Sequence, residues 1–329
     1  MIIFKCTYSK NVGFMKGCFL VLSTKNSFLR NLWKNKALML FVLPGAILIL
    51  LFNYVPMFGL VLAFKDFNYA KGIFGSGWVG LNNIKFLFIS GDTTWRLMRN
   101  TVGYYFLFQF VGTVANVSLA LALNEWRKKR FAKVSQTIMI MPNFISWIAI
   151  SFIVRGLLTS TGMVNSIITA FGGDPVSFYS DPKYWPVILT LVNVWKGTGY
   201  GSVLYLSALA GMDQEIFEAA KLDGASKWQE IRYVTLPMLA SMIAILTLLS
   251  LGNIMVSNTG LFYQVTRNIG ALYPTTQTLD SYVLNAMANG GVKYGVTAAI
   301  TLFQSVVGCF MVVVVNLIVR KFSPENSLF

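Results

Sequence analysis

Long apolar runs alternate along this chain with short polar stretches that hold most of its charges. The runs are continuous and do not alternate apolar with polar residues, which predicts helices rather than strands of a β-barrel. A helix needs about 20 residues to cross the hydrocarbon core of a bilayer, and six runs reach that length. We therefore predict an all-α fold, a polytopic transmembrane helical bundle with six spans. The predicted spans are Ala37–Phe64, Asn100–Leu123, Val134–Leu158, Trp185–Ala210, Val234–Ser257 and Val296–Val319.

Basic residues are concentrated in the stretches that would lie on one side of the membrane. Residues 1–36 contain six lysines and one arginine but no acid, and a basic run at Arg127–Arg130 follows the second span. Because basic residues are enriched in cytoplasmic loops, both termini are predicted to be cytoplasmic. The predicted organisation is a basic tail at 1–36, a six-span domain at 37–320 and a second tail at 321–329.

Composition excludes several other functions. Hydrophobic residues make up 55% of the chain and charged residues only 12%, about half the usual charged share of a soluble domain. The net charge of +15 does not indicate nucleic-acid binding, because the basic residues lie beside apolar segments. The chain has no histidine, and its three cysteines (Cys6, Cys18 and Cys309) form no metal-ligand or disulfide pattern. No Walker A motif or catalytic triad is present, so we predict neither ATP binding nor enzymatic activity in this chain.

One predicted cytoplasmic stretch, residues 211–233, holds five acids and three bases on a side that is otherwise strongly basic. Asp213 is placed to cap a helix, and Gly224 is placed to end that helix in a left-handed turn. A second helix is predicted from about Ser226, and Pro237 is predicted to open the fifth span. Composition alone favours a solvated helical connector at this position.

The spacing of residues in this stretch favours a more specific interpretation. Glu218-Ala219-Ala220, Gly224 and Leu236-Pro237 are spaced as in the EAA loop of ABC importer permeases, which this loop resembles, with Val234 at a position that is isoleucine in the family. Other short stretches resemble the polysaccharide-type permeases of the maltose-permease superfamily. These stretches include LPG at 43–45, AFKDFN at 63–68, WVGLNN at 78–83, LALNEWRKKRF at 121–131 and LDSYV at 279–283.

The resemblance implies a type I ABC importer permease fold, in the cell membrane of a bacterium, and covers nearly the whole chain from about residue 30. It implies that the loop at 213–237 couples the spans to a cytosolic ATPase. The implied partners are a second homologous permease in a heterodimer, two ATPase subunits that bind ATP and Mg, and an extracellular solute-binding lipoprotein. Lys65–Arg99 and Asn258–Lys293 are the candidate surfaces for docking that lipoprotein. The residues assigned to coupling are Glu218, Ala219, Ala220, Asp223, Gly224, Leu236 and Pro237.

Polar side chains inside the predicted spans are candidates for a substrate cavity, because such groups are costly in a membrane. Lys196, near the middle of the fourth span, could meet a carboxylate, which would suit uronate-containing oligosaccharides. Alternatively, the aromatic residues pack or face lipid, Gln109 and Asn116 bond between helices, and Arg155 extends to the membrane surface. The glycines at 197–201 favour close helix packing or flexible gating over a phosphate-binding loop. The candidates for the substrate cavity are Asn143, Asn193, Trp195, Lys196, Tyr200 and Asn253.

Two other classes of membrane protein compete with the importer permease. An ion-coupled secondary transporter would need coupling groups in the spans, yet no Asp or Glu lies in any of the six. A channel or scaffold subunit would leave the loop at 213–237 unexplained. The sequence therefore favours a permease that translocates oligosaccharides delivered by an extracellular binding protein.

Overall fold

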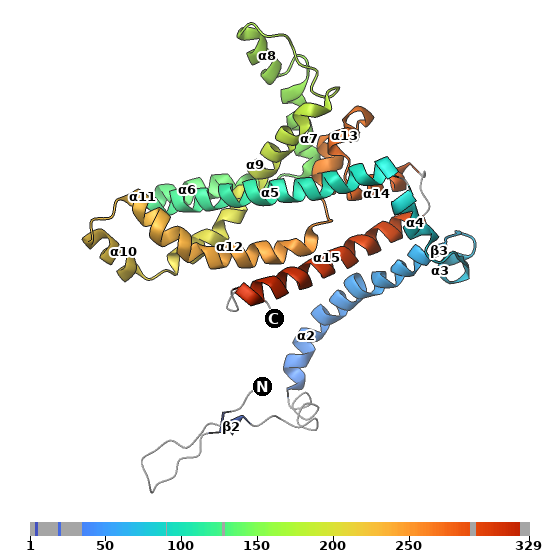
Figure 1. The fold of residues 1–329 in the computed structure, drawn as a ribbon, viewed down its shortest axis with the longest axis horizontal. Helices are drawn as coiled ribbons and strands as arrows, with labels where there is room; N and C mark the ends of the chain where they lie inside the picture. Colours follow the sequence, from blue (N-terminus) through green and yellow to red (C-terminus); the bar gives the residue numbers. More distant parts are fainter. Residues whose placement is uncertain are drawn as a thin grey trace. The chain divides into compact units, whose positions relative to one another are not determined.

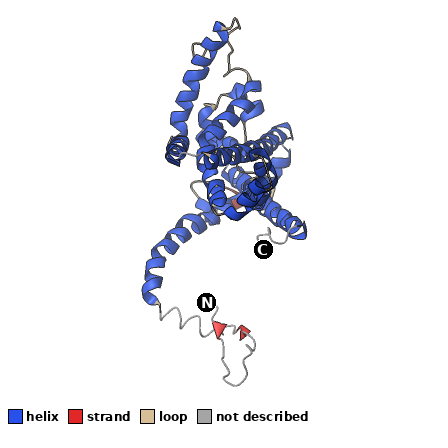
Figure 2. Ribbon diagram, turned by 90° about the vertical axis from the view of Figure 1, so that its left-hand side faces the viewer, coloured by secondary structure: helices blue, strands red, loops and turns tan. Residues whose placement is uncertain are grey.

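The computed structural model describes residues 4–5, 19–20, 35–89, 91–126, 129–289 and 294–322. The chain divides into two compact units, residues 1–60 and 61–329. The described residues are almost entirely helical (Figure 2), which confirms the predicted all-α class. Most of the predicted tails at 1–36 and 321–329 lies outside the described residues. The strands within the described ranges are two-residue antiparallel pairs, β1 (Phe4–Lys5) with β2 (Phe19–Leu20) and β3 (Lys65–Asp66) with β4 (Gly77–Trp78).

The predicted first span is a continuous run of helical turns. It consists of α2 (Lys36–Ile49), the π-turn η1 (Leu50–Tyr54) and the 3-10 segment η2 (Val55–Phe64), which crosses the boundary between the two units. Pro56 has no N–H to donate, so the regular α-helical bonding changes near it. The apolar side chains of α2 are exposed, and Phe41 is 85% exposed. An all-round apolar, exposed helix is what contact with lipid requires.

The second unit is built on four long helices: α5 (Gly91–Glu125), α9 (Trp185–Ala210), α12 (Leu236–Ser250) and α15 (Tyr294–Phe322). α5 packs along α9, while α12 contacts both α9 and α15 (Figure 1). A small-residue contact helps these helices approach closely, because Ala120 of α5 is completely buried. The core between α5, α9 and α12 is formed by Val117, Ala120, Tyr205, Leu209 and Leu239.

Five described helical segments are long and apolar enough to cross a membrane: Leu38–Phe64, Gly91–Glu125, Trp147–Ala170, Lys227–Asn253 and Tyr294–Lys321. The predicted fourth span is observed as α9 with the predicted bounds, although α9 is not among these five. Polar residues in its middle, including Asn193 and Lys196, lower its mean hydropathy.

The prediction of one continuous third helix at Val134–Leu158 is wrong. The structure divides this stretch into α6 (Lys129–Ile140), the 3-10 turn η3 (Met141–Phe144) and α7 (Trp147–Leu158). Pro142 cannot donate a backbone hydrogen bond, and Ser146 starts a new helix by accepting one from the Ala149 N–H at 3.2 Å. The membrane-length segment here is instead Trp147–Ala170, which ends with α8 (Met163–Ala170).

The two stretches predicted to dock a binding protein contact each other. Arg99 of α5 donates to the Pro274 carbonyl at 2.9 Å, and Arg96 donates to Gln277 Oε1 at 3.1 Å. Just beyond the first stretch, Asn100 donates from Nδ2 to the Gln277 carbonyl at 3.0 Å. Thr101 accepts from the Leu279 N–H at 3.0 Å. Outside the connection between α9 and α12, the remaining described elements are α3 (Gly72–Gly75), α4 (Asn82–Ile89), η4 (Pro182–Tyr184), η6 (Leu251–Asn253), η7 (Gly260–Val265), η8 (Gly270–Leu272), α13 (Tyr273–Thr276) and α14 (Leu279–Ala288).

Candidate coupling segment and transport cavity

The connection between α9 and α12, residues 213–237, is called the coupling segment below. It begins with α10 (Gln214–Leu222), which Asp213 caps by accepting from the Glu215 N–H at 3.0 Å. Gly224 has a φ of +79°, and the next N–H, from Ala225, donates to the Ala220 carbonyl at 3.0 Å. A left-handed residue is favoured as glycine because a Cβ would crowd the backbone. Both predicted ends of this helix are confirmed.

The predicted start of the second helix at Ser226 is also confirmed, because Ser226 and Gln229 form a reciprocal capping box before α11 (Lys227–Glu230). The helix then continues through the π-turn η5 (Ile231–Thr235) into α12. Pro237 opens α12, the long helix of the fifth span, as predicted, but helical turns precede it from Lys227. Pro237 lies in the first turn of α12, inside a helix that starts at Lys227, and its missing N–H accounts for the wider turn before it.

The coupling segment presents an uncovered surface in this structure. α10 has no buried residue, and it lies away from the helix bundle (Figure 1). Leu222 is 89% exposed, and the apolar side chains of Ile216 and Trp228 are also exposed. Of the residues predicted to couple, all are exposed except Ala220, which is half-buried. Exposed apolar side chains on an otherwise polar helix are typical of a protein-interaction site.

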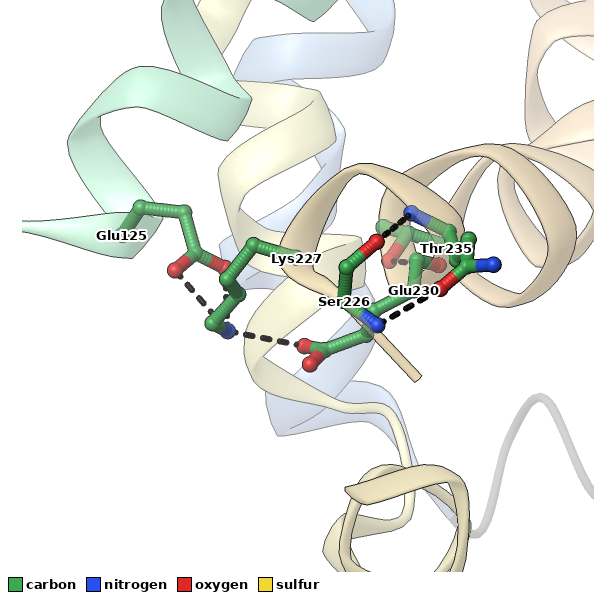
Figure 3. Close-up of polar contacts among 6 residues, drawn as sticks. Glu125, Ser226, Lys227, Glu230 and Thr235 are labelled. Carbon is green, nitrogen blue, oxygen red and sulfur yellow. Dashed lines mark hydrogen bonds and ion pairs between the residues drawn. The ribbon is translucent and has the colours of Figure 1, made fainter. Parts of the chain in front are cut away.

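A network of ion pairs ties the coupling segment to the end of α5 (Figure 3). Lys227 Nζ lies 3.0 Å from Glu125 Oε2 and 3.0 Å from Glu230 Oε1. Glu125 is the last residue of α5, and the Glu230 side chain is only 5% exposed. This network is not predicted from the sequence. The i, i+3 spacing of Lys227 and Glu230 is a local signal for one of the two ion pairs. Glu125 is distant in sequence and comes close to Lys227 only in the folded protein.

A polar cavity of about 300 Å³ lies between α5 and α9. Asn193 of α9 lines it and also lines an adjacent cavity of about 270 Å³. Gln109 lines both cavities and donates to Thr247 Oγ1 of α12 at 3.3 Å, which confirms it as an interhelical hydrogen-bond partner. Thr198 Oγ1 is buried without a hydrogen-bond partner among the described residues. The cavity can therefore accept a polar ligand or water.

Lys196 lies at the break between α6 and α7. Its Nζ donates to three backbone carbonyls, those of Pro142 at 3.2 Å, Asn143 at 2.9 Å and Ile145 at 2.6 Å. An ammonium group has three N–H donors, so all of them are used and none remains for a substrate carboxylate. The ammonium also lies 5.0 Å from the Trp147 ring centroid, in cation–π geometry. This lysine satisfies the carbonyls that the interrupted helix leaves free.

The other predicted cavity residues are dispersed. Asn143 contributes its carbonyl to Lys196, while Trp195, Tyr200 and Asn253 are exposed and line neither of the two cavities described above. The close packing predicted for the glycines at 197–201 is confirmed at Gly199. A Cβ built there would lie 1.8 Å from the Met139 carbonyl oxygen of α6.

The membrane-length helices and their packing define a multi-pass membrane protein. Residues 111–324 match the family of binding-protein-dependent transport system inner membrane components. The chain belongs to this family and is the permease subunit of an ABC importer, which is a transport component and not itself an enzyme. Family membership excludes the ion-coupled transporter and the channel that the sequence left as alternatives.

Relatives cover almost the whole chain. Protein LplB of Bacillus subtilis (strain 168) is 34% identical over 301 residues, which span 91% of this chain and 93% of LplB. The polygalacturonan/rhamnogalacturonan transport system permease protein YteP of the same organism is 32% identical over 303 residues, with coverage of 92% and 93%. These relatives confirm the predicted resemblance to polysaccharide-type permeases.

Solved structures confirm the predicted permease fold. A chain of a bacterial ABC transporter involved in the import of the acidic polysaccharide alginate superposes with a TM-score of 0.80 at 29% identity, covering 90% of this chain and 99% of that one. A second structure holds the alginate transporter in complex with an alginate pentasaccharide-bound periplasmic protein. Its TM-score is 0.79 at 29% identity, with coverage of 89% and 97%.

Proposed function

We propose that this chain is one permease of an ATP-driven importer that takes up oligosaccharides, including acidic, uronate-containing ones, from an extracellular binding lipoprotein. The observation that carries the proposal is the coupling segment, whose uncovered helix α10 is followed after a short turn by α11. Lys227 ties α11 to α5, and α11 runs through η5 into α12. A protein that binds α10 would move both long helices. We propose that this protein is an ATPase dimer, which binds ATP and Mg, and that both termini and the coupling segment are cytoplasmic.

A second, homologous permease completes the proposed translocation path. The polar cavities between α5 and α9 support this path, because they place amide and hydroxyl groups where a sugar needs hydrogen-bond partners. We propose that Asn193 contacts the sugar and that Asn143, Trp195, Tyr200 and Asn253 face the path once the second permease is bound. Lys196 supports the path indirectly, by holding the break between α6 and α7.

Acidic substrates are supported by the described relatives. YteP is named for transport of polygalacturonan and rhamnogalacturonan, and the structurally similar transporter imports alginate. Both kinds of polymer carry carboxylates. The sequence identities of 32% and 29% extend over most of the chain, which is why we include uronate-containing oligosaccharides among the substrates.

The test is ATP-dependent uptake by the assembled importer in proteoliposomes that contain the second permease, the ATPases and the binding protein. Uptake of labelled oligogalacturonate is compared with uptake of a neutral oligosaccharide of equal length. Glu218→Lys and Gly224→Pro in the coupling segment are expected to abolish uptake while ATP hydrolysis continues. Asp174→Lys, a matched charge reversal at an exposed residue outside the coupling segment, is expected to have no effect. Normal uptake by both coupling variants would refute the proposed function.

A further inference from the structure

A cavity of about 430 Å³ lies near the end of α9 that is opposite the coupling segment. It is bounded by the end of α7, residues 177–180 and residues 267–269. Phe178 lines it and accepts a hydrogen bond from Trp185 Nε1, in the first turn of α9, at 2.7 Å. One wall of the cavity is therefore held in place by the buried Trp185. Its volume is within the range of small-molecule sites, about 300–1,000 Å³.

The lining of this cavity is cationic and rich in hydroxyl groups. Arg155 comes from the last turn of α7, and Arg267 follows η7. No lining residue is acidic, and neither guanidinium has a hydrogen-bond or ion-pair partner among the described residues. Two unpartnered arginines facing one cavity favour binding of an anion. The hydroxyl groups of the lining belong to Thr159, Ser160, Ser177, Tyr179 and Ser180.

The backbone that carries Arg267 is held in an unfavourable conformation. Arg267 and Asn268 have φ values of 56° and 52°, in the left-handed region. Non-glycine residues in this region are strained and persist only where their surroundings hold them in place. Here the Asn268 side chain donates to Asn285 Oδ1 at 2.8 Å and accepts from the Tyr273 hydroxyl at 2.9 Å. These bonds keep the turn rigid and hold Arg267 at the cavity.

Arg155 lies close enough to Tyr179 to act on its hydroxyl group. Burial raises the pKa of Tyr179 to about 12, and the charge of Arg155 partly opposes that rise by lowering the pKa. Tyr179 is held in place because its hydroxyl donates to the Val265 carbonyl at 3.5 Å, a long contact. The positive charge of Arg155 therefore acts at the wall of the cavity, beside a neutral hydroxyl whose one proton is donated to Val265.

We propose that this cavity is a carboxylate-recognising subsite for acidic oligosaccharides at the outer mouth of the permease. The inference rests on the proposed function, which supplies the orientation and the substrate. A planar guanidinium matches a carboxylate with two parallel hydrogen bonds, and the hydroxyl-lined wall suits the hydroxyl groups of a sugar. A neutral sugar has no negative charge to pair with the two guanidinium groups, so the subsite favours uronate units as they leave the binding protein.

The test uses the whole importer in proteoliposomes with its binding protein. The variants are Arg155→Gln, Arg267→Gln and the double change, with Lys183→Gln as a control for an exposed basic residue outside the cavity. Each arginine variant is expected to raise the KM for oligogalacturonate about tenfold or more, the usual effect of losing a hydrogen bond to a charged group. The KM for a neutral oligosaccharide of equal length and the ATPase activity should stay the same.

A second measurement on the wild-type protein needs no variant. Raising the salt concentration should increase the KM for the acidic oligosaccharide and leave the KM for the neutral one unchanged. The binding protein's affinity for the complex is measured in parallel in all variants.

Several results would overturn the subsite. Unchanged uptake of the acidic oligosaccharide in the double variant would do so, and the proposed function would remain. Equal loss of acidic and neutral uptake, with weaker binding-protein affinity, would show that the arginines hold an acidic side chain of that protein. A wild-type importer that takes up neutral but no acidic oligosaccharides would refute the acidic part of the proposed function, and the subsite with it.

Discussion

Lys227 is the best position at which to test how the coupling segment is held. Its ammonium joins two carboxylates that differ greatly in exposure (Figure 3). The Glu125 side chain is 36% exposed, whereas the Glu230 side chain is 5% exposed. Removal of the lysine therefore leaves one carboxylate in water and the other buried without its charge partner. The perturbation we consider is Lys227→Met, which keeps most of the side chain's length.

The two pairs differ in expected energy. Breaking a buried ion pair by removing one partner costs about 3–5 kcal/mol. The Lys227 side chain is 57% exposed, so screening by water reduces the expected loss to about 1–3 kcal/mol. Glu125→Gln removes only the exposed pair and should cost no more than about 1 kcal/mol. The double change Lys227→Met with Glu230→Gln removes the lysine and the buried carboxylate together, so it should be more stable than Lys227→Met alone.

The assay is the apparent Tm of the purified complex, together with the ratio of substrate imported to ATP hydrolysed. A loss of 1 kcal/mol in stability lowers Tm by roughly 2–4 °C in a large domain. The Tm of the Lys227→Met variant should therefore fall by several degrees, and that of the Glu125→Gln variant by much less. The ratio of substrate imported to ATP hydrolysed should also fall more in Lys227→Met than in Glu125→Gln, because Lys227 no longer holds α11 to the end of α5. Equal effects of the two single variants, or no recovery in the double variant, would refute the reasoning.

Three further outcomes follow from single contacts. Lys196→Met should lower the apparent Tm by several degrees. The carbonyls at the break between α6 and α7 lose their donor, and each unsatisfied carbonyl costs about 1–3 kcal/mol. Lys183→Met removes an exposed ion pair and is the control, whose Tm should change little. Gly224→Ala should cost about 1–2 kcal/mol in the left-handed turn and lower the ratio of import to hydrolysis without abolishing it. Gly199→Leu should push α9 away from the Met139 carbonyl of α6 and reduce folded yield in detergent-based size exclusion, whereas an unchanged yield would contradict the observed packing.

The sequence predicted those parts of the fold that depend on local signals. Asp213, Gly224 and Ser226 each act within a few residues of themselves, through a cap or a turn, and the structure confirms all three. The apolar runs predicted where the long helices lie, because burial in lipid requires a continuous apolar surface. The family pattern identified the coupling segment for the same reason, since its residues lie close together in the chain.

Features that depend on distant partners were missed. The break at Met141–Phe144 lies inside an apolar run, and the carbonyls it frees are satisfied by Lys196 from another helix. The sequence therefore marked Lys196 as a substrate ligand, although its donors are used within the protein. Arg155 and Arg267 likewise meet only after α7 and the residues following η7 pack together. No periodicity in the sequence reports such contacts.

The most direct measurement is site-specific crosslinking of α10 in the assembled importer. A cysteine at Ala219, which is exposed, is placed in a variant without Cys6, Cys18 and Cys309, and a matched cysteine at Ser160 serves as control. We expect the Ala219→Cys variant to crosslink to the ATPase subunit, with a crosslinking yield that changes when ATP is added. We also expect that membrane-impermeant thiol reagents added outside the cell do not label this cysteine. Crosslinking to the ATPase from Ser160→Cys but not Ala219→Cys, or labelling of Ala219→Cys from outside, would contradict the account.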